Sequence, residues 1–538
     1  MMEKATVVVI GGGATGVGIL RDLAMRGVDV LLVEKCDLVN GASSRYHGLL
    51  HSGGRYAVKD QEAARECIIE NQILRKIGKS CVEATGGMFV RLDIDDPDYE
   101  PQWVKGCADS GIKAEPITLE QAFRLEPLLS KHVVSAYLVP DAAIDGFRMS
   151  WQNVESAKRY GGRFKTYREV VDVLQQNGEI QGVTVRNTIT GEIEEIACDI
   201  LVNAAGGWAG KVAALAGLEV GVQPDKGTLL AFNQRITSHV VNRLHKSSDG
   251  DIFVPHGSIT ILGTSSMSIP DPEDTSTSRE EVENLLSIGE KTFENLRDYR
   301  MLRAFAGSRP LYMPPGGASG RGASRGFAIV DHGKDDGLKG MMTIVGGKFT
   351  TYRLMAEKIS NQICEKLNVK EPCRTAEEPL VPEVAENDKK EARKYFPAYG
   401  TDLAATRLGP ERFSRVVEDL KSHPEKRELV CECENVTLAE VEEIAKELSS
   451  FQINDIRRRT RIGMGTCQAN FCALRSAAVF AKCGRDKGAK DSLGQMKQFL
   501  QGRWKGIRPV LVGRTLREIE MTRALYELSF HVDGGKKA

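Results

Sequence analysis

The chain has 538 residues, which at about 150 residues per domain predicts three or four domains with full-sized cores. Its 73 basic and 73 acidic residues leave no net charge, so general nucleic-acid binding, which usually shows as a basic excess, is not expected. With 41% hydrophobic and 27% charged residues, the composition excludes a disordered or fibrous protein.

Two features bear on targeting. Residues 1–13 lack the basic region, apolar stretch and small-residue cleavage site of a secretory signal. The longest uncharged run, 252–270, contains proline, histidine and six Ser/Thr residues, which disfavours a membrane-spanning helix. We therefore expect no signal peptide and no transmembrane segment. The twelve cysteines are expected in a reducing compartment, where closely spaced thiols indicate metal or redox chemistry.

The N-terminal residues predict a strand, a glycine-rich turn, a helix and a second strand. Residues 5–10 are apolar and β-branched, 14–26 carry a helical pattern, and 28–35 return as a buried strand. Further strands and helices alternate without internal repeats, which favours an α/β fold with an inserted second sheet. The expected strands are 170–174, 199–206, 258–266 and 341–347, and the expected helices are 62–77, 151–160, 280–297 and 351–367.

The composition changes after Leu367. Residues 371–394 carry three prolines and many charges, which is typical of a linker, and the chain beyond them is helical, basic and rich in paired cysteines. The expected divisions are a first domain over 1–370, a linker over 371–395, a helical connector over 396–428, a cysteine domain over 429–485 and a C-terminal helical tail over 486–538.

The turn at residues 11–16 reads G-x-G-x-x-G between a strand and a helix, which indicates a dinucleotide site. Gly11 permits the tight turn, Gly13 lets a pyrophosphate approach the backbone, and Gly16 lets helix and strand pack closely. The helix N-terminus supplies amides to the phosphates, and Glu34, which ends the second strand, would bind ribose hydroxyls. An ordinary glycine-rich turn is the alternative, and the flanking elements disfavour it.

No second fingerprint of this kind occurs, so a reductase that pairs FAD with NAD is not expected. Four segments, in this order, resemble landmarks of the FAD-dependent glycerol-3-phosphate dehydrogenases, within the D-amino-acid-oxidase-like flavoproteins. The segments are His51-Ser52-Gly53-Gly54-Arg55-Tyr56, Asn203-Ala204-Ala205-Gly206, Arg309-Pro310-Leu311 and Gly346-Gly347-Lys348. The C-terminal cysteines narrow the resemblance, which covers essentially the whole chain, to the large (A) subunits of the anaerobic enzymes.

The resemblance implies a fold and a cofactor. The implied fold is α/β, with a Rossmann-like FAD-binding domain and an inserted antiparallel-sheet substrate domain over 1–370, and a small helical C-terminal domain of [2Fe–2S] type. The residues implied to bind FAD are Ile10, Gly11, Gly12, Gly13, Ala14, Thr15, Gly16, Glu34, Lys35, Ser43, Ser44, His47, Val170, Ala205, Gly206, Gly347, Lys348 and Thr350.

The resemblance also implies a phosphate site, for which arginine is suited because its guanidinium binds phosphate with two hydrogen bonds. Arg55, Arg309 and Arg325, together with Tyr56 and Thr264, are implied to hold the substrate. Ordinary surface charge is the alternative for these arginines. Lys348 would stabilise the anionic reduced flavin, unless it is simply a solvated lysine beside a helix.

A catalytic base must take the proton of the alcohol. The aerobic relatives carry a histidine three residues after the lysine of a Lys-Gly-Ser-His segment, whereas this chain reads Lys226-Gly227-Thr228-Leu229. We therefore expect His51 to be the base, followed by His256, with a structural role as the alternative for either. The expected catalytic residues are thus His51, Lys348 and Arg309.

Four cysteines form a second candidate site. Cys431 and Cys433 make C-x-C, and after 33 intervening residues Cys467 and Cys472 make C-x4-C. Four thiolates suit a [2Fe–2S] cluster. The pattern, with the basic segment 457–468, resembles the bacterioferritin-associated-ferredoxin type of domain. A zinc site and unrelated buried thiols stay open.

The sequence therefore favours oxidation of sn-glycerol 3-phosphate to dihydroxyacetone phosphate in glycerol catabolism, with hydride passing from C2 to flavin N5. Electrons would reach a quinone indirectly through B and C subunits, with the chain held peripherally on the cytoplasmic side of the inner membrane. The alternatives are a flavoenzyme that oxidises another 2-hydroxy acid or an amino acid, and a non-catalytic electron-relay scaffold.

Overall fold

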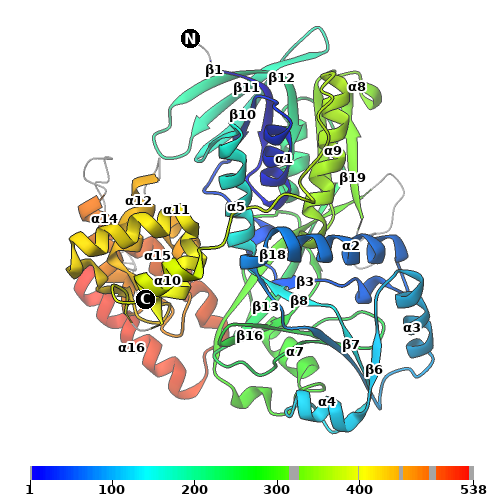
Figure 1. The fold of residues 1–538 in the computed structure, drawn as a ribbon. Helices are drawn as coiled ribbons and strands as arrows, with labels where there is room; N and C mark the ends of the chain where they lie inside the picture. Colours follow the sequence, from blue (N-terminus) through cyan, green and yellow to red (C-terminus); the bar gives the residue numbers. More distant parts are fainter. Residues whose placement is uncertain (1–2, 314–325, 398, 448–451, 484–491, 532–538) are drawn as a thin grey trace. The chain divides into compact units, whose positions relative to one another are not determined.

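The computed structural model describes residues 3–313, 326–397, 399–447, 452–483 and 492–531, and the chain divides into two compact units (Figure 1). The first comprises Met1–Arg300 and Phe305–Leu380, and the second comprises Met301–Ala304 and Val381–Ala538. The segment expected to be a linker is therefore divided at Leu380. The N–H of Leu380 donates to the carbonyl of Ile77 in the first unit at 2.9 Å.

The first sheet is mixed and contains the βαβ unit expected at the N-terminus. β1 pairs in parallel with β2 on one side and with β12 on the other. β12 pairs antiparallel with β11 along its first half and parallel with β20 along its second half. The eight strands are β1 (Glu3–Ile10), β2 (Val30–Val33), β9 (Arg163–Lys165), β10 (Arg168–Gln176), β11 (Glu179–Asn187), β12 (Ile193–Asn203), β19 (Phe327–Asp331) and β20 (Met341–Gly346).

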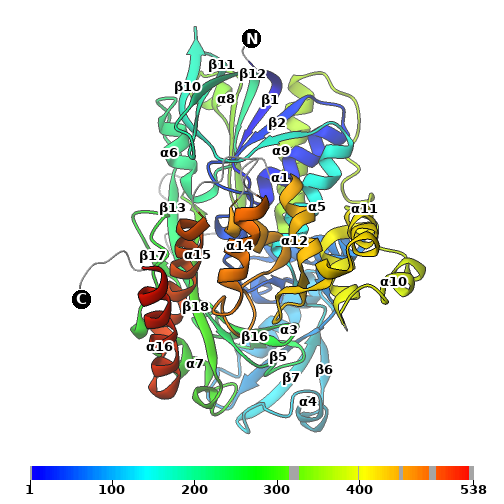
Figure 2. The ribbon, with the colours of Figure 1, turned by 90° about the vertical axis from the view of Figure 1, so that its left-hand side faces the viewer.

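Both faces of the parallel part of this sheet are buried, as expected for parallel strands, whereas β10 and β11 carry exposed residues. On one face, α1 (Ala14–Met25) packs against α5 (Gly146–Arg159) and α9 (Tyr352–Lys366). Side chains of β1 alternate between the faces: Val7 and Val9 join the core beneath α1, whereas Val8 and Ile10 join the opposite core, which includes residues near α6 (Ala209–Ala214). Figure 2 shows α6 on the other side of the sheet from α1.

The second sheet was expected to be antiparallel, but it is mixed, because β5 and β14 pair in parallel. These two strands are separated in sequence by residues 93–239, so no hairpin forces them to run antiparallel. The nine strands are β5 (Gly87–Leu92), β6 (Glu115–Ile117), β7 (Val133–Val139), β13 (Val222–Phe232), β14 (Val240–Arg243), β15 (Ile252–His256), β16 (Ile259–Gly263), β17 (Met267–Ser268) and β18 (Met301–Tyr312). A small third sheet contains β3 (Leu49–Leu50), β4 (Val82–Glu83) and β8 (Ala142–Ile144).

Two expected helices have different limits in the structure. α5 begins at Gly146, because the side chain of Asp145 caps it by accepting from the N–H of Arg148 at 3.1 Å. α7 (Arg279–Gly289) ends eight residues early, because Phe293 turns into the core, where its ring centroid lies 4.6 Å from that of Phe253. The remaining helices of the first unit are α2 (Gln61–Ile77), α3 (Tyr99–Asp109), α4 (Leu119–Leu125) and α8 (His332–Asp335).

The described residues of the second unit are mainly helical, with the first residues of β18 and a short hairpin of β21 (Leu429–Cys431) and β22 (Val436–Thr437). One core combines residues from the expected connector, cysteine domain and tail: Phe413, Cys431, Cys472, Phe499 and Trp504 all belong to it. The tail is thus an integral part of this unit. Its helices are α10 (Glu386–Ala392), α11 (Gly400–Ser422), α12 (Leu438–Glu447), α13 (Ile453–Thr460), α14 (Cys472–Cys483), α15 (Ser492–Ile507) and α16 (Gly513–Phe530).

Across the described ranges of both units, no helix has the length and apolar character that crossing a bilayer requires.

Candidate active site

The glycine-rich turn between β1 and α1 is built as the fingerprint predicts. Gly11 has φ +108°, and a Cβ there would lie 2.7 Å from the carbonyl oxygen of Ala204. A Cβ on Gly16 would lie 1.9 Å from the carbonyl oxygen of Gly11, so this glycine lets α1 start against the turn. A Cβ on Gly13 would meet only the Ser43 hydroxyl, at 3.3 Å. Gly13 therefore presents bare backbone to the space in front of the turn.

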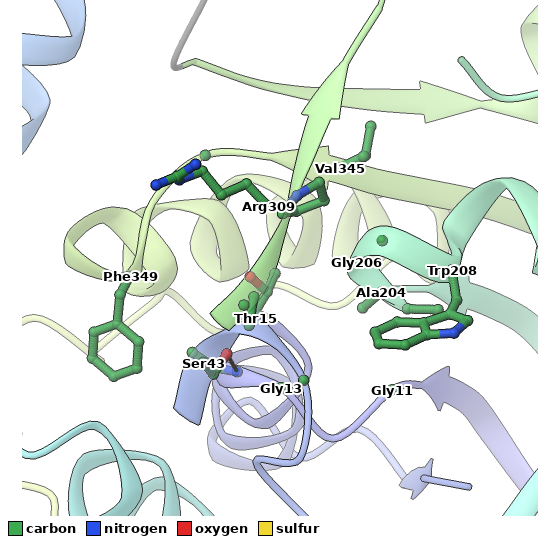
Figure 3. A pocket seen from close by; sticks show the side chains of 18 of the residues that line it. Gly11, Gly13, Thr15, Ser43, Ala204, Gly206, Trp208, Arg309, Val345 and Phe349 are labelled. Carbon is green, nitrogen blue, oxygen red and sulfur yellow. Dashed lines mark hydrogen bonds between the residues drawn. The ribbon is translucent and has the colours of Figure 1, made fainter. Parts of the chain in front are cut away.

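That space is a cavity of about 540 Å³, within the size range of ligand pockets (Figure 3). It is lined by all the residues expected to bind FAD except Gly12, Gly16 and Ser44. These three have local roles instead. A Cβ on Gly12 would lie 2.5 Å from the Leu38 side chain, and the Ser44 hydroxyl donates to the carbonyl of Gly41 at 3.1 Å.

Glu34 lies in the cavity wall at the end of β2. Its carboxylate accepts from the N–H of Gly12 at 2.7 Å and from the N–H of Cys36 at 2.9 Å. Complete burial raises the pKa of Glu34, while the two amide hydrogen bonds favour its charged form. The carboxylate is therefore fixed by the backbone at the strand end, where a ribose hydroxyl is expected.

Beside Glu34 the structure adds two residues that the sequence analysis missed, Trp208 and Glu273. Lys35 pairs with Glu273 at 2.5 Å and lies 4.5 Å above the ring of Trp208. The indole N–H also donates to Glu273, at 2.9 Å. Trp208 follows the carboxyl end of β12, and ligands of open α/β sheets bind at such ends, so the strand prediction offered a signal for it.

Arg309, on β18, lies with Phe349 at the end of the cavity away from Trp208 (Figure 3). Its guanidinium donates to the Asp225 carboxylate, to the Thr264 hydroxyl and to the Ser265 carbonyl. A Cβ on Gly227 would fall 2.3 Å from this guanidinium, so the glycine provides the room it occupies. The Arg309 side chain is 26% exposed and lines the cavity, as expected of an anion-binding group.

His51, Tyr56 and Lys348 are brought together in the cavity wall. The ring centroids of His51 and Tyr56 are 5.6 Å apart, and the Lys348 ammonium lies 4.8 Å from the Tyr56 ring centroid. The backbone N–H of His51 donates to the Thr350 hydroxyl at 3.2 Å, which ties the histidine segment to the turn after β20. The imidazole of His51 and the cationic side chains of Lys348 and Arg309 therefore line one cavity.

Two residues expected in the site are placed elsewhere. Arg55 does not line the cavity, because it pairs with the buried Asp251 at 2.9 Å. Burial works to raise the pKa of Asp251, but Arg55 and His245 outweigh it and hold the pKa below its ordinary value. His256 does not line the cavity either, because its Nε2 donates to the carbonyl of His47 at 2.8 Å. The expected roles of Arg55 and His256 in substrate binding and catalysis therefore stay predictions. Arg325 lies outside the described residues.

His47 lines the cavity beside His51, with ring centroids 5.7 Å apart. Its Nδ1 accepts from the N–H of Leu49 at 3.1 Å, so the ring proton resides on Nε2. Burial, with smaller contributions from Arg309 and Arg55, lowers the pKa of His47 to about 3. Leu229, which stands where the aerobic relatives carry histidine, is buried in the same wall.

The second unit gathers Cys431, Cys433, Cys467 and Cys472, hereafter the cysteine quartet. Hydrogen bonds from Cys472 lower the pKa of Cys467 to about 5 and that of Cys431 to about 7, and they raise the pKa of Cys472 itself. Burial raises the pKa of Cys433 to about 11, although this thiol also contacts Cys467. The fold therefore brings the two cysteine pairs, which are distant in sequence, into one connected group of sulfurs.

In the described parts of the chain, no three or more His, Cys, Asp or Glu side chains are placed to hold a metal ion. A [2Fe–2S] cluster has a different requirement, because each of its irons takes only two thiolates. The quartet supplies four connected sulfurs for such a cluster. The guanidinium of Arg503 is buried, its Nε has no hydrogen-bond partner among the described residues, and its pKa is influenced by Cys467 and Cys472.

Known proteins share both the sequence and the fold. The A chain of the Escherichia coli K12 enzyme named anaerobic glycerol-3-phosphate dehydrogenase is 43% identical over 98% of this chain and 96% of its own length. The A1 chain of the enzyme of the same name from Haloferax volcanii is 42% identical over 99% of this chain and 92% of its own. The solved glycerol-3-phosphate dehydrogenase of Bacillus halodurans, complexed with FAD, superposes with a TM-score of 0.70 at 20% identity, covering 95% of this chain and 97% of that one.

Residues 6–353 match the family described as FAD dependent oxidoreductase. The residues present fit that cofactor, since the bare backbone of Gly13, the carboxylate of Glu34 and the cavity between them are what a dinucleotide requires. The chain therefore belongs to the FAD-dependent oxidoreductases and, among them, to the family of the large (A) subunits of anaerobic glycerol-3-phosphate dehydrogenases.

Proposed function

We propose that this protein oxidises sn-glycerol 3-phosphate to dihydroxyacetone phosphate. The observation that carries the proposal is the 43% identity, over nearly the full length of both chains, to a protein named for this reaction. The cavity supports it, because Arg309, Lys348 and His51 supply an anion site and a base beside the dinucleotide-binding turn.

FAD supplies a two-electron acceptor for the hydride of the substrate C2–H bond when it is bound in the cavity. Gly13 and Glu34 would hold its pyrophosphate and ribose, and Lys35 with Trp208 would lie at the same end. Lys348 follows two glycines of positive φ, Gly346 and Gly347, in the turn after β20. Its ammonium would favour negative charge on the reduced ring system.

Arg309 would bind the substrate phosphate. Its contacts with Asp225 and Thr264 fix the plane of the guanidinium, so the fork is oriented before substrate arrives. Arg55 would act indirectly by holding Asp251, which lies beneath the same wall. A role for Arg325 is proposed on the family resemblance alone.

His51 would take the hydroxyl proton of the substrate as the hydride leaves. His47 is the other histidine in the wall, but a group with a pKa of about 3 is a poor base at neutral pH. The His47 ring instead offers an Nε2–H donor, because its Nδ1 is occupied by the Leu49 amide. Although Leu229 cannot act as a base, the site therefore still contains one in His51.

The cysteine quartet would hold a [2Fe–2S] cluster that carries electrons one at a time towards a quinone through further subunits. The relatives are named as single components of a larger enzyme, which supports the existence of such partners. Met521, Leu525 and Leu528 are exposed at helical spacing on α16 and would supply a contact surface for such partners. Attachment to the cytoplasmic side of the inner membrane would then depend on the partner chains.

An anaerobic titration tests the substrate assignment. The absorbance of bound FAD should bleach on addition of glycerol 3-phosphate, and not with 2-hydroxyglutarate or with an amino acid added at equal concentration. Bleaching only by one of the other compounds would reassign the enzyme to that substrate. If no candidate substrate bleaches the cofactor, the protein is a relay scaffold and the proposed activity is wrong.

A Cys472→Ser variant tests the relay. It should still be bleached by glycerol 3-phosphate and reduce an artificial dye, but it should lose bound iron and the transfer of electrons to quinone in membranes. Cys483→Ser, at the other end of α14, is the matched control and should leave all of these unchanged. Full quinone reduction by the Cys472→Ser variant would contradict the relay.

A further inference from the structure

Arg503, on α15, is a buried guanidinium with no compensating carboxylate among the residues that the structure describes. The residue is 7% exposed, and within the described ranges its Nε has no hydrogen-bond partner and no carboxylate forms an ion pair with it. Its Nη2 donates to the side-chain oxygen of Gln468. An uncompensated buried charge is strongly destabilising, so such a group calls for an anion nearby.

The groups around Arg503 make a nearby negative charge still more necessary. Burial lowers the pKa of Arg503 well below its ordinary value, and two further arginines, Arg303 and Arg457, lower it more. The groups that act in the opposite direction are Cys472 and Cys467. Among the described residues, the strongest opposing influences on the pKa of Arg503 therefore come from two members of the cysteine quartet.

The hydrogen bond to Gln468 holds the Arg503 guanidinium against the loop that carries Cys467 and Cys472. Gln468 follows Cys467 directly and is buried, and its amide nitrogen donates to the carbonyls of Met464 and Gly465 at 3.0 and 2.9 Å. Gln468 and Ala469 both have positive φ, so the loop that carries two of the four thiols turns tightly around this side chain. Arg503 therefore contacts the loop rather than the solvent.

We propose that Arg503 is a positioning residue that sets the charge balance of a [2Fe–2S] cluster in the cysteine quartet and raises its reduction potential. The inference rests on the proposed cluster. Two Fe³⁺, two sulfides and four thiolates carry a net charge of −2, and one electron, supplied in the enzyme by reduced flavin, converts this to −3. A fixed positive charge stabilises the −3 state more than the −2 state, so its removal should make reduction harder.

The test compares four full-length proteins after anaerobic reconstitution with iron and sulfide: wild type, Arg503→Met, Arg503→Lys and Arg508→Met. Arg508 lies five residues further on and is exposed, so its variant controls for the loss of one arginine from this region. Iron and sulfide content are measured, together with the midpoint potential from a dithionite titration followed by electron paramagnetic resonance.

We expect wild type to bind about two irons and two sulfides per chain. In Arg503→Met the ratio of reduced to oxidised cluster at a fixed potential should fall at least tenfold, which is 59 mV for a one-electron couple. Arg503→Lys, which keeps the charge, should stay close to wild type, and Arg508→Met should match it. Loss of the cluster in Arg503→Met but not in Arg503→Lys supports the same conclusion.

Three results would overturn the inference. An unchanged potential in Arg503→Met refutes the role of Arg503 and leaves the cluster standing. Loss of iron in both Arg503 variants shows that the side chain is needed for its shape and not for its charge. A wild-type protein that binds no iron refutes the cluster and the role of Arg503 together, and iron analysis distinguishes that case from the other two.

Discussion

Replacing Gly13 by alanine should separate cofactor binding from folding. Gly13 is the N-cap of α1 with φ −76° and ψ 177°, a conformation that any residue adopts, and the added methyl group would meet only the Ser43 hydroxyl at 3.3 Å. The free energy of unfolding of the apoprotein should therefore change by less than about 1 kcal/mol. The methyl group would, however, occupy the place that a pyrophosphate approaches.

The magnitude of the binding defect follows from the contacts that would be lost. Hydrogen bonds to a charged group contribute about 1.5–3 kcal/mol each, so the loss of two costs about 3–6 kcal/mol. This corresponds to a Kd for FAD that is raised by roughly 10²- to 10⁴-fold. The assay is a fluorescence titration of apoprotein with FAD, with thermal unfolding of the apoprotein measured in parallel.

Gly16→Ala is the contrasting variant. Its methyl group would lie 1.9 Å from the backbone oxygen of Gly11, so it should lower the stability of the apoprotein itself, by about 3 kcal/mol or more. Should Gly13→Ala bind FAD as tightly as wild type, the pyrophosphate does not pass over Gly13, and the fingerprint has been interpreted incorrectly.

Three further predictions concern the cavity. Arg309→Lys should raise the KM for glycerol 3-phosphate at least tenfold, because a single ammonium cannot reproduce the two-bond fork; unchanged steady-state kinetics would remove Arg309 from the phosphate site. His51→Asn should slow flavin reduction by roughly 10²-fold or more in stopped-flow measurements, and a wild-type rate would assign the base elsewhere. His47 has a folded pKa of about 3 against an unfolded value of 6.5, so the unfolded chain binds the proton first and stability falls as the pH drops below 6.5. Between pH 6.5 and 5 this loss amounts to about 2 kcal/mol, and urea unfolding of His47→Gln should show a pH dependence that is weaker by that amount.

The sequence motif predicted the glycine-rich turn, because the conformation of this turn depends mainly on residues close together in the chain. The fingerprint at residues 11–16 predicted the turn, the helix and the close packing at Gly16, because these groups lie within one βαβ unit. Arg309 and Lys348 were identified only through the family resemblance. Their spacing reveals nothing of the cavity, since the elements that carry them, β18 and the turn after β20, meet the first βαβ unit through tertiary packing.

What the sequence did not reveal depends on contacts between residues that are far apart in the chain. Arg55 lies in a glycine-rich segment and looks available, but its partner Asp251 is almost two hundred residues away. The parallel pairing of β5 with β14 likewise depends on which distant strands become neighbours, and hydrophobic patterns do not encode direction. The buried apolar residues of α15, such as Phe499 and Trp504, pack in the core shared with α11 and β21, which the sequence expectation of a separate tail did not include.

The way in which the last two helices hold the cysteine loop has a consequence for biosynthesis. Arg503 reaches Gln468, and the hydroxyl of Tyr526 donates to the carbonyl of Asn470 at 2.7 Å, so both anchors of the 467–472 loop follow it in the chain. During translation all four thiols leave the ribosome before these anchors exist. If the quartet holds the proposed cluster, iron and sulfide would be loaded after these two helices have been synthesised, and a nascent chain stalled before residue 503 would carry all four thiols on a loop that lacks both contacts.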